Sequence, residues 1–257
     1  MTREEIELNL RTEIFGRELH TFNSLDSTNR FAKTIAAHGA PEGTLVIAEE
    51  QFEGRGRRGR RWHSAPGANL TFSIIIRPRV PPRLIGLLSL YGGLAIAEAL
   101  REMTPIRPVC KWPNDVLLDG KKVCGILSEA AFQREQLAAA VIGIGVNVNQ
   151  TEFPASIEKP ATSLACCAGK SFDRAAVLAT LLLQLERRYE LIRQMKYQQL
   201  VDAWLGWTRM LGKEIIVSQQ GEIVRGISKS VSEDGSLILD TGHGERKVVA
   251  GDVTIIS

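Results

Sequence analysis

The sequence predicts an α+β protein in two parts, with a mixed β-sheet domain over residues 1–210 and a small β-barrel over residues 211–257. Three observations support this prediction. Before residue 211, segments with helical periodicity alternate with short apolar runs, as in helices packed on a sheet. After residue 211, short β-rich runs are separated by turns, which is typical of a small barrel. A chain of 257 residues can also bury a large core beside a small domain.

The larger domain is expected to begin with a helix and a buried strand. Asp26 or Ser27 can cap the helix, and Phe31 and Ile35 belong to its apolar stripe. The pair Asp119-Gly120 is a strong signal for a hairpin turn between two short strands. The expected elements are, in order, helix 27–37, strand 44–48, strand 70–76, helix 83–102, strands 116–118 and 122–127, strand 138–148 and the helical segment 173–205.

The barrel is expected to contain short strands joined by tight turns. Turns are expected at Ser232–Gly235 and Thr241–Gly244, because glycine and small polar residues favour them. The expected strands are 214–218, 223–229, 236–239 and 246–249.

Charge and cysteine content narrow the class of protein. The net charge is only +3, so a general polyanion-binding surface is not expected. The charged N-terminus lacks the apolar core of a signal peptide, and the apolar run Leu84–Ala97 is too short to span a bilayer. The four cysteines form no CxxC pair and have no histidine at metal spacing, which indicates reduced structural thiols. The sequence therefore predicts a cytoplasmic protein without a membrane partner.

The most concentrated signal is a loop rich in arginine and glycine, residues 54–61, which we call the Arg-Gly loop. Five arginines lie within residues 55–61, and they are interleaved with Gly56 and Gly59 and preceded by Gly54. At a spacing of about 7 Å in water, each neighbouring pair of like charges costs roughly 0.6 kcal/mol. We therefore expect the loop to be mobile when empty. It should become ordered when an anion neutralises it and accepts hydrogen bonds from its backbone N–H groups.

A second cluster reads Lys111-Trp112-Pro113-Asn114-Asp115, or KWPND. The proline holds the preceding tryptophan in an extended conformation. A cation, an amide and a carboxylate are thus held within five residues at the entrance to a strand. The alternative interpretation is an ordinary β-turn.

Three further motifs are weaker. Glycines in the strand before Asn147 can mark close approach of a ligand, or a simple bulge. Lys122 follows the hairpin turn, where most lysines are solvated, although Gly125 again permits close approach. The sequence Ser27-Thr28-Asn29 offers three hydrogen-bonding side chains at a helix N-terminus, where a simple cap is the alternative.

Several familiar catalytic patterns are absent from the sequence. Gly169-Lys170-Ser171 looks like the end of a phosphate-binding Walker loop, but the required earlier glycine would fall at Leu164. The four histidines are scattered along the chain, so neither a histidine-based triad nor a protein metal site is predicted.

Taken in order, the motifs resemble those of biotin–protein ligases. The Arg-Gly loop followed by KWPND at family-like spacing is highly specific, and the resemblance covers about residues 15–257. It implies a catalytic domain of the biotin/lipoate ligase type followed by a barrel similar to the family's SH3-like domain. The residues that carry the resemblance are Ser27, Thr28, Asn29, Gln51, Gly54 to Arg60, Trp62, Lys111 to Asp115, Lys122, Gly125 and Gly143 to Asn147.

The resemblance implies a two-step acyl transfer. The carboxylate of biotin attacks the α-phosphate of ATP, which arrives with Mg²⁺, and gives biotinyl-5′-AMP and pyrophosphate. A lysine of a biotin carboxyl carrier protein then attacks the mixed anhydride and releases AMP. Because an anionic carboxylate must approach an anionic phosphate, fixed cations and backbone donors have to offset the repulsion.

The resemblance also implies a role for each site residue. The biotin site comprises Ser27, Thr28, Asn29, Gln51, Arg55, Gly56, Arg57, Lys122 and Gly125. The nucleotide site comprises Arg58, Arg60, Trp62, Lys111, Asn114 and Asn147, with the tryptophan over the adenine. The catalytic residues are Lys122, Arg57, Lys111 and Asp115. Lys122 would donate to the carboxylate and the bridging phosphate oxygens, and Asp115 would orient or deprotonate the incoming lysine.

Two alternative functions agree less well with the sequence. A lipoate–protein ligase shares the fold and the two-step chemistry, but the family's Arg-Gly loop argues against it. A nucleic-acid-binding module of the RGG type is disfavoured because the loop is single and aromatic residues do not alternate with the basic ones. Too few residues precede Ser27 for the winged-helix domain of some family members, so a monofunctional ligase without DNA binding is expected. The sequence leaves open whether the protein forms a homodimer.

Overall fold

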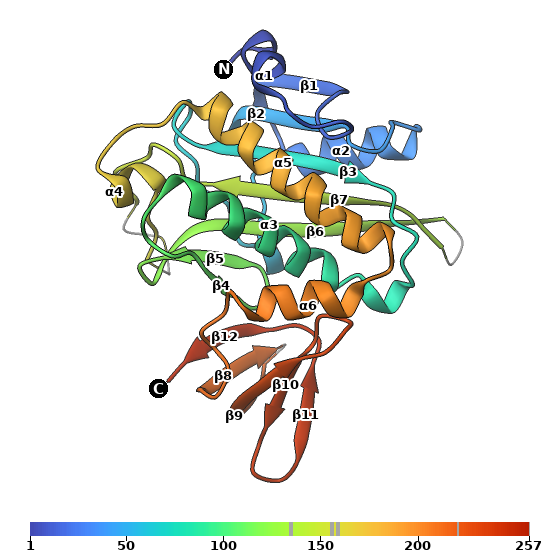
Figure 1. The fold of residues 1–257 in the computed structure, drawn as a ribbon, viewed down its shortest axis with the longest axis vertical. Helices are drawn as coiled ribbons and strands as arrows, with labels where there is room; N and C mark the ends of the chain where they lie inside the picture. The colour runs from blue at the N-terminus through green and yellow to red at the C-terminus, as the bar shows by residue number, and fades with distance from the viewer. Residues whose placement is uncertain (134–135, 155–156, 158–159, 220, 257) are drawn as a thin grey trace.

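A computed structural model describes residues 1–257 except 134–135, 155–156, 158–159, 220 and 257. Its larger part is built on a seven-stranded sheet (Figure 1). The strands are β1 (Leu19–Leu25), β2 (Leu45–Gln51), β3 (Leu70–Ile76), β4 (Val109–Lys111), β5 (Asp115–Leu118), β6 (Lys121–Gln133) and β7 (Gln136–Val146). Their order across the sheet is β1-β2-β3-β7-β6-β5-β4. The sheet is mixed, as predicted, because β1 and β2 pair in parallel and the other neighbours pair antiparallel.

Helices pack on both faces of this sheet (Figure 1). They include α2 (Thr28–Ala37), α3 (Leu87–Met103), α5 (Arg174–Arg193) and α6 (Tyr197–Leu205). On one face, Ala32 and Ala36 of α2 pack with Val46 and Ile75 in a small separate core. The other three helices contribute to the main core on the opposite face. Strand β3 is buried on both sides, which explains why it is mostly apolar, with Thr71 and Ser73 as its polar residues.

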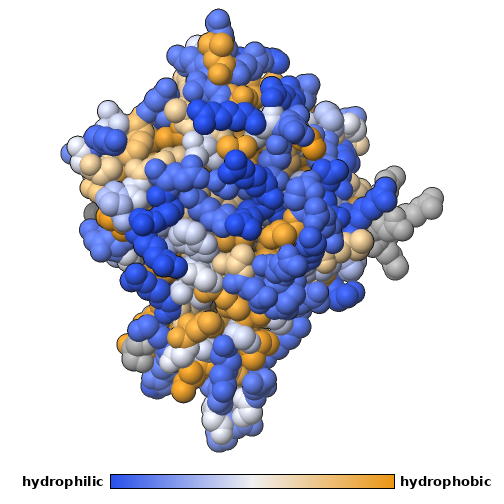
Figure 2. Space-filling model, viewed as in Figure 1, coloured by the Kyte–Doolittle hydropathy of each residue, from blue (hydrophilic) through white to orange (hydrophobic). Residues whose placement is uncertain are grey.

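The C-terminal part is a five-stranded antiparallel sheet below α6 (Figure 1). Trp112 joins it to the larger part, because its Nε1 donates to the carbonyl of Gly235 at 2.8 Å and its ring is buried. Figure 2 shows hydrophobic residues on the surface of this part, where Ile223 and Val249 are exposed. The strands are β8 (Glu214–Gln219), β9 (Glu222–Val231), β10 (Leu237–Asp240), β11 (Glu245–Val248) and β12 (Asp252–Ile255).

These two parts confirm the predicted fold class, an α+β protein with a small C-terminal β-domain of the SH3-like type. The boundary at residue 211 stays a prediction, and it falls in the connection between α6 and β8. Five elements were not predicted: α1 (Arg3–Asn9), β1, β4, α4 (Leu164–Ala168) and β12. Strand β1 mixes buried, half-buried and exposed positions at the sheet edge, so its sequence lacks the clear alternation that marks a strand.

The predicted helical segment 173–205 is confirmed, and it is divided into two helices, α5 and α6. Met195 adopts a left-handed conformation with φ of 55°, which ends α5 and turns the chain into α6. The backbone N–H of Lys196 donates back to the carbonyl of Leu191 and closes this turn. The apolar periodicity continues across the break, since both helices face the same core, and periodicity alone cannot show such a turn.

Helix α3 confirms the predicted buried helix. The expectation that this apolar segment is too short to span a bilayer was wrong. With the preceding turn, Pro82–Met103 spans 22 residues and is long and apolar enough to cross a membrane by length and composition. However, 72% of its most apolar window is buried inside the protein, between the sheet and α5 (Figure 1). Its apolar character therefore reflects a position in the core.

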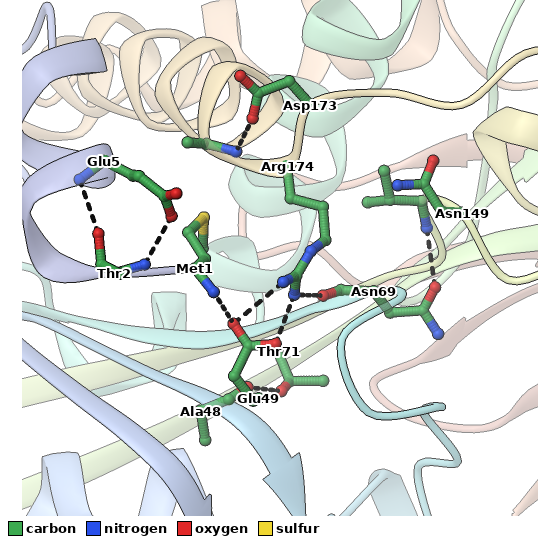
Figure 3. Close-up of polar contacts among 12 residues, drawn as sticks. Met1, Thr2, Glu5, Ala48, Glu49, Asn69, Thr71, Asn149, Asp173 and Arg174 are labelled. Atoms are coloured by element: carbon green, nitrogen blue, oxygen red, sulfur yellow. Dashed lines mark hydrogen bonds and ion pairs between the residues drawn. The ribbon is translucent and has the colours of Figure 1, made fainter.

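Arg174, the first residue of α5, ties this helix to the sheet (Figure 3). Its guanidinium donates to both carboxylate oxygens of Glu49 in β2, at 2.7 and 3.2 Å, and to the carbonyl of Asn69 at 3.1 Å. The side-chain oxygen of Asn69 in turn accepts from the backbone N–H of Val148 at 3.0 Å. This chain of contacts holds the backbone just after β7, where Asn147 meets the site described below.

Candidate active site

A cavity of about 320 Å³ lies where β6, β7, the Arg-Gly loop and β12 meet. The structure brings nearly all the predicted site residues to this one cavity. Those that line it are Ser27, Thr28, Asn29, Gln51, Arg55, Gly56, Arg57, Arg60, Trp62, Lys111, Asn114, Asp115, Lys122, Gly125 and Asn147. Arg58 lines a separate surface hollow with Ser218 and Gln219.

Glycines make the floor of the cavity on β6 and β7. A Cβ at Gly143 would lie 2.1 Å from Oδ1 of Asn29, and one at Gly145 would lie 2.3 Å from the indole of Trp62. A Cβ at Gly125, which pairs with Gly145 across the two strands, would lie 3.0 Å from the Lys122 side chain and 3.1 Å from the ring of Trp62, which is a tight contact. The glycines thus mark close approach of the protein's own side chains, and the predicted close approach of a ligand stays a prediction.

The positions along and just after β7 fix the order of the side chains across the cavity floor. Gly143, Gly145 and Asn147 are two residues apart along the chain, and in a strand such positions face the same side at about 7 Å spacing. The polar side chain of Asn29 therefore marks one end of the floor, Trp62 the middle and Asn147 the far end. The whole span is about 13 Å, which suits an extended ligand with different chemistry at its two ends.

The polar end is a connected hydrogen-bond network. The backbone N–H and the hydroxyl of Thr28 lie 2.8 and 3.1 Å from Oε1 of Gln51. Behind them, the Ser73 hydroxyl lies 2.8 Å from the Thr28 hydroxyl and 2.6 Å from Oδ1 of Asn29. Ser27 caps α2, which confirms the cap interpretation, and the three residues also line the cavity, where their role as a binding site stays a prediction.

The middle of the cavity is cationic. Nζ of Lys122 lies 2.6 Å from Oδ1 of Asp115 and 5.6 Å from the ring centre of Trp62. Nη1 of Arg57 donates to Oδ1 of Asn114 at 3.3 Å, and Nδ2 of Asn114 donates to a backbone carbonyl of β6. Burial lowers the pKa of Arg57, with Asp252 as the largest opposing influence. A desolvated cation attracts an incoming anion strongly, because little water screens it.

The Arg-Gly loop closes on itself above this region. The backbone N–H of Gly56 donates to the carbonyl of Arg60 at 2.7 Å, and that of Trp62 donates to Gly54 at 3.0 Å. Asp252 of β12 binds both Arg58 and Arg60, at 3.1 and 2.6 Å. This carboxylate offsets part of the repulsion that the sequence predicts within the loop. The expected mobility of the empty loop stays a prediction.

Asn147 supplies an unsatisfied group at the far end of the floor. Its Nδ2 donates to the carbonyl of Thr162 at 3.0 Å, whereas its buried Oδ1 has no hydrogen-bond partner among the described residues. Within the same residues, the buried Nε1 of Trp62 also lacks a partner. Buried polar atoms of this kind are costly unless a ligand or water satisfies them.

Three residues of the site were missed by sequence reasoning. Ser73 was expected only as part of an apolar strand, Glu129 lies in β6 beyond the end of the predicted strand 122–127, and Asp252 lies in the unpredicted β12. A serine in an otherwise apolar buried run was the available signal for Ser73. For Glu129 and Asp252, whose partners are about a hundred or more residues away, no local signal existed.

No group of three or more histidine, cysteine, aspartate or glutamate side chains that could hold a metal ion occurs in the part of the chain that the structure describes. The carboxylates among the cavity-lining residues are Asp115 and Asp252, and both are engaged with cations. Magnesium in nucleotide sites is commonly held by substrate phosphates with one or two carboxylates. This donor set therefore fits an ion that enters with a triphosphate.

Comparison with known proteins shows where this arrangement recurs. Residues 21–147 match the biotin/lipoate A/B protein ligase family, and residues 210–255 match the biotin protein ligase C-terminal domain. The chain is 34% identical over 257 residues to the bifunctional ligase/repressor BirA of Bacillus subtilis (strain 168), covering 99% of this chain and 79% of that protein. It is also 34% identical over 258 residues to the biotin–acetyl-CoA-carboxylase ligase of Mycobacterium tuberculosis, covering 96% and 94%.

Solved structures agree with the sequence relatives. The biotin protein ligase from Aquifex aeolicus in complex with biotin and ATP superposes with a TM-score of 0.80 at 30% identity, covering 93% of this chain and 99% of that one. The similarity extends over both the sheet that carries the cavity and the C-terminal domain. The chain therefore belongs to the biotin protein ligase family.

Proposed function

We propose that this protein is an ATP-dependent biotin–protein ligase, which converts biotin into biotinyl-5′-AMP and transfers the biotinyl group to a lysine of a biotin carboxyl carrier protein. The observation that carries the proposal is the order of groups along β7: a polar network, a cationic middle and a buried amide oxygen. Biotin has a ureido head, an aliphatic tail and a carboxylate. This order matches such a molecule followed by a nucleotide.

The polar end suits the head of biotin. A ureido ring presents one carbonyl acceptor and two N–H donors, and Thr28, Gln51 and Ser27 offer both donors and acceptors there. An apolar head, such as the dithiolane of lipoate, would leave the hydrogen-bonding capacity that these groups still have toward the cavity without a partner. Each unpaired buried group costs about 1–3 kcal/mol, so the geometry favours biotin over lipoate.

The cationic middle suits the adenylation step. One carboxylate oxygen of biotin forms a bond to the α-phosphorus of ATP, and the bond to the bridging oxygen breaks as pyrophosphate leaves. Lys122 and Arg57 stand where negative charge gathers, and they stabilise it most while it is spread over the five-coordinate phosphorus. Lys111 and Asn114 lie beside them in the lining and face the triphosphate with its Mg²⁺.

The far end suits the nucleotide. The exocyclic amino group of adenine donates hydrogen bonds, and Oδ1 of Asn147 is an acceptor without a partner among the described residues. Trp62 offers an aromatic face beside it. Arg60 lines the cavity and Arg58 lies just outside, so we assign direct nucleotide contact to Arg60 and a supporting role to Arg58.

The second step transfers the acyl group to the carrier. The lysine amine attacks the carbonyl carbon of the anhydride, AMP departs, and the amine loses a proton. Asp115 lies in the cavity and is paired with Lys122. We assign it first to orienting Lys122, and second to accepting the proton if that ion pair opens when pyrophosphate has left.

Release of pyrophosphate from ATP tests the proposal, with biotin, lipoate and octanoate compared at equal concentration. We expect release that depends on biotin, followed by transfer to an apo carrier protein detected as a mass increase on one lysine. Release without biotin, or equal release with lipoate, would contradict it. Cytoplasmic location and the lack of DNA binding remain predictions, and formation of a homodimer is left open. Light scattering with and without biotin plus ATP tests the last of these.

A further inference from the structure

Two residues lie behind the polar end of the cavity and are outside its described lining: Ser73 of β3, which is completely buried, and Glu129 of β6. Both contact Asn29, through its two different side-chain atoms. They have no role in the chemistry described so far. Their hydrogen bonds nevertheless decide how the cavity-lining Thr28 presents its hydroxyl.

Glu129 sets the orientation of the Asn29 amide. Nδ2 of Asn29 lies 2.9 Å from Oε2 of Glu129 and 3.2 Å from the carbonyl of Leu127. Both neighbours are acceptors, so the NH₂ group must face them and Oδ1 must face Ser73. Burial alone would raise the pKa of Glu129, but hydrogen bonds from Lys33, at 2.8 Å, and Asn29 outweigh it and lower the pKa. The acceptor is therefore an ionised carboxylate at neutral pH.

Ser73 has one hydroxyl proton and two close neighbours. Oδ1 of Asn29, at 2.6 Å, carries no proton, so it takes the proton of Ser73. The 2.8 Å contact between Ser73 and Thr28 must then use the proton of Thr28. The other neighbour of the Thr28 hydroxyl, Oε1 of Gln51, is also an acceptor. In either case an acceptor of the protein takes the single proton of Thr28, so a ligand group that reaches this hydroxyl has to donate to its oxygen.

We propose that Ser73 and Glu129 are positioning residues that hold Oγ1 of Thr28 as a hydrogen-bond acceptor for an N–H group of the ureido ring of biotin. This inference rests on the proposed function. When Thr28 donates to Ser73, the hydrogen bonds run in one direction, from the ligand N–H through Thr28, Ser73 and Asn29 to the Glu129 carboxylate. Bonds aligned in this way polarise one another, and a terminal charge strengthens the chain further.

The test compares Ser73→Ala and Glu129→Gln with a matched control, Thr71→Val. Thr71 lies two residues from Ser73 on the same strand and is equally buried, and its hydroxyl donates to the carbonyl of Ala48 at 2.8 Å, away from the cavity lining (Figure 3). We expect Kd for biotin, measured by calorimetry, to rise about tenfold in Ser73→Ala and Glu129→Gln. The control should change it less than twofold. The KM for ATP at saturating biotin should stay the same in all three.

Two biotin analogues, each methylated at a different ureido nitrogen, distinguish a positioning role from a purely structural effect. A purely structural effect would weaken the binding of both analogues alike. For the analogue that has lost the N–H facing Thr28, Ser73→Ala should cost no further affinity. If Ser73→Ala weakens the binding of both analogues as much as it weakens the binding of biotin, the inference is wrong. It is also wrong if Thr71→Val weakens biotin binding as much as Ser73→Ala does. If the wild-type protein does not bind biotin, the proposed function itself fails. If wild type and variants bind biotin equally, only the inference fails.

Discussion

Arg60 and Asp252 form a two-pronged ion pair between the Arg-Gly loop and the C-terminal domain. Nη1 of Arg60 lies 3.0 Å from Oδ1 of Asp252, and Nη2 lies 2.6 Å from Oδ2. Arg58 shares the same carboxylate and also donates to the carbonyl of Ser218 in β8. The small C-terminal domain therefore holds the loop over the cavity, and the loop position depends on a residue about 190 positions away in sequence.

Asp252→Asn should weaken this attachment while keeping the size of the side chain. Partly exposed ion pairs contribute up to about 1 kcal/mol, so we expect biotinyl-AMP to leave about three- to fivefold faster. Stopped-flow release of the adenylate measures this rate. Glu214→Gln is the control, because Glu214 pairs with Arg225 on the same sheet without touching the loop. An unchanged release rate in Asp252→Asn would show that the attachment does not hold the loop closed.

Lys122→Ala should slow adenylation far more than it disturbs binding. A charge-assisted hydrogen bond to the reacting groups contributes about 1.5–3 kcal/mol, which corresponds to a loss of roughly 10- to 150-fold. Single-turnover release of pyrophosphate at saturating biotin and ATP measures this step. The adjacent Lys121, which is exposed, provides the control variant Lys121→Ala. Near wild-type turnover in Lys122→Ala would refute the role of Lys122.

Features whose signals lie within a few residues of one another could be predicted from the sequence, whereas features that depend on distant residues could not. The strand at β3 and the turn at Asp119-Gly120 were predicted because their signals lie within a few residues. The left-handed Met195 was not predicted, since an unbranched apolar residue gives no sign of that conformation. The motif residues of the site could be predicted from the family resemblance. The roles of Ser73 and Asp252 could not, because they come from contacts with α2 and the Arg-Gly loop that exist only after folding.

Gly145→Ala should displace Trp62. The added Cβ would lie 2.3 Å from Cε2 of the indole, so the ring must move, and overpacking of this kind costs about 1–3 kcal/mol. We expect a change in tryptophan fluorescence and at least a tenfold loss of affinity for biotinyl-AMP. Gly93→Ala is the matched control, because a Cβ there meets neighbours at 3.5 Å and beyond. An unchanged spectrum and affinity in Gly145→Ala would contradict the position of the ring.

Glu49→Gln should reduce stability more at neutral pH than in acid. Burial opposes ionisation of Glu49, but hydrogen bonds from Arg174 and the amino group of Met1 outweigh it and lower its pKa below the ordinary value (Figure 3). A carboxylate with a lowered pKa contributes stability above its unfolded pKa, near 4.5, and loses that contribution as the pH falls through the folded pKa. We expect a loss of about 1 kcal/mol at pH 7 that is smaller at about pH 3, in the direction that the lowered pKa sets.

Urea unfolding of wild type and Glu49→Gln at both pH values measures this difference. Glu190→Gln serves as the control, because Glu190 forms an exposed pair with Arg193 within one helix. Equal destabilisation of Glu49→Gln at the two pH values would show that the ionised form of Glu49 is not what stabilises the protein.

The four cysteines should differ sharply in reactivity. Cys110 and Cys124 are completely buried, and burial raises the pKa of both thiols far above the ordinary value. Cys166 is exposed and Cys167 is partly buried. Because the thiolate is the reactive form, a thiol reagent at pH 8 should modify Cys166 first, and Cys110 and Cys124 only at the rate of unfolding. Mass spectrometry of the modified protein, with Cys166→Ser as the control, measures this order. Rapid modification of Cys110 or Cys124 in the folded protein would contradict the packing of β4 and β6 against α3.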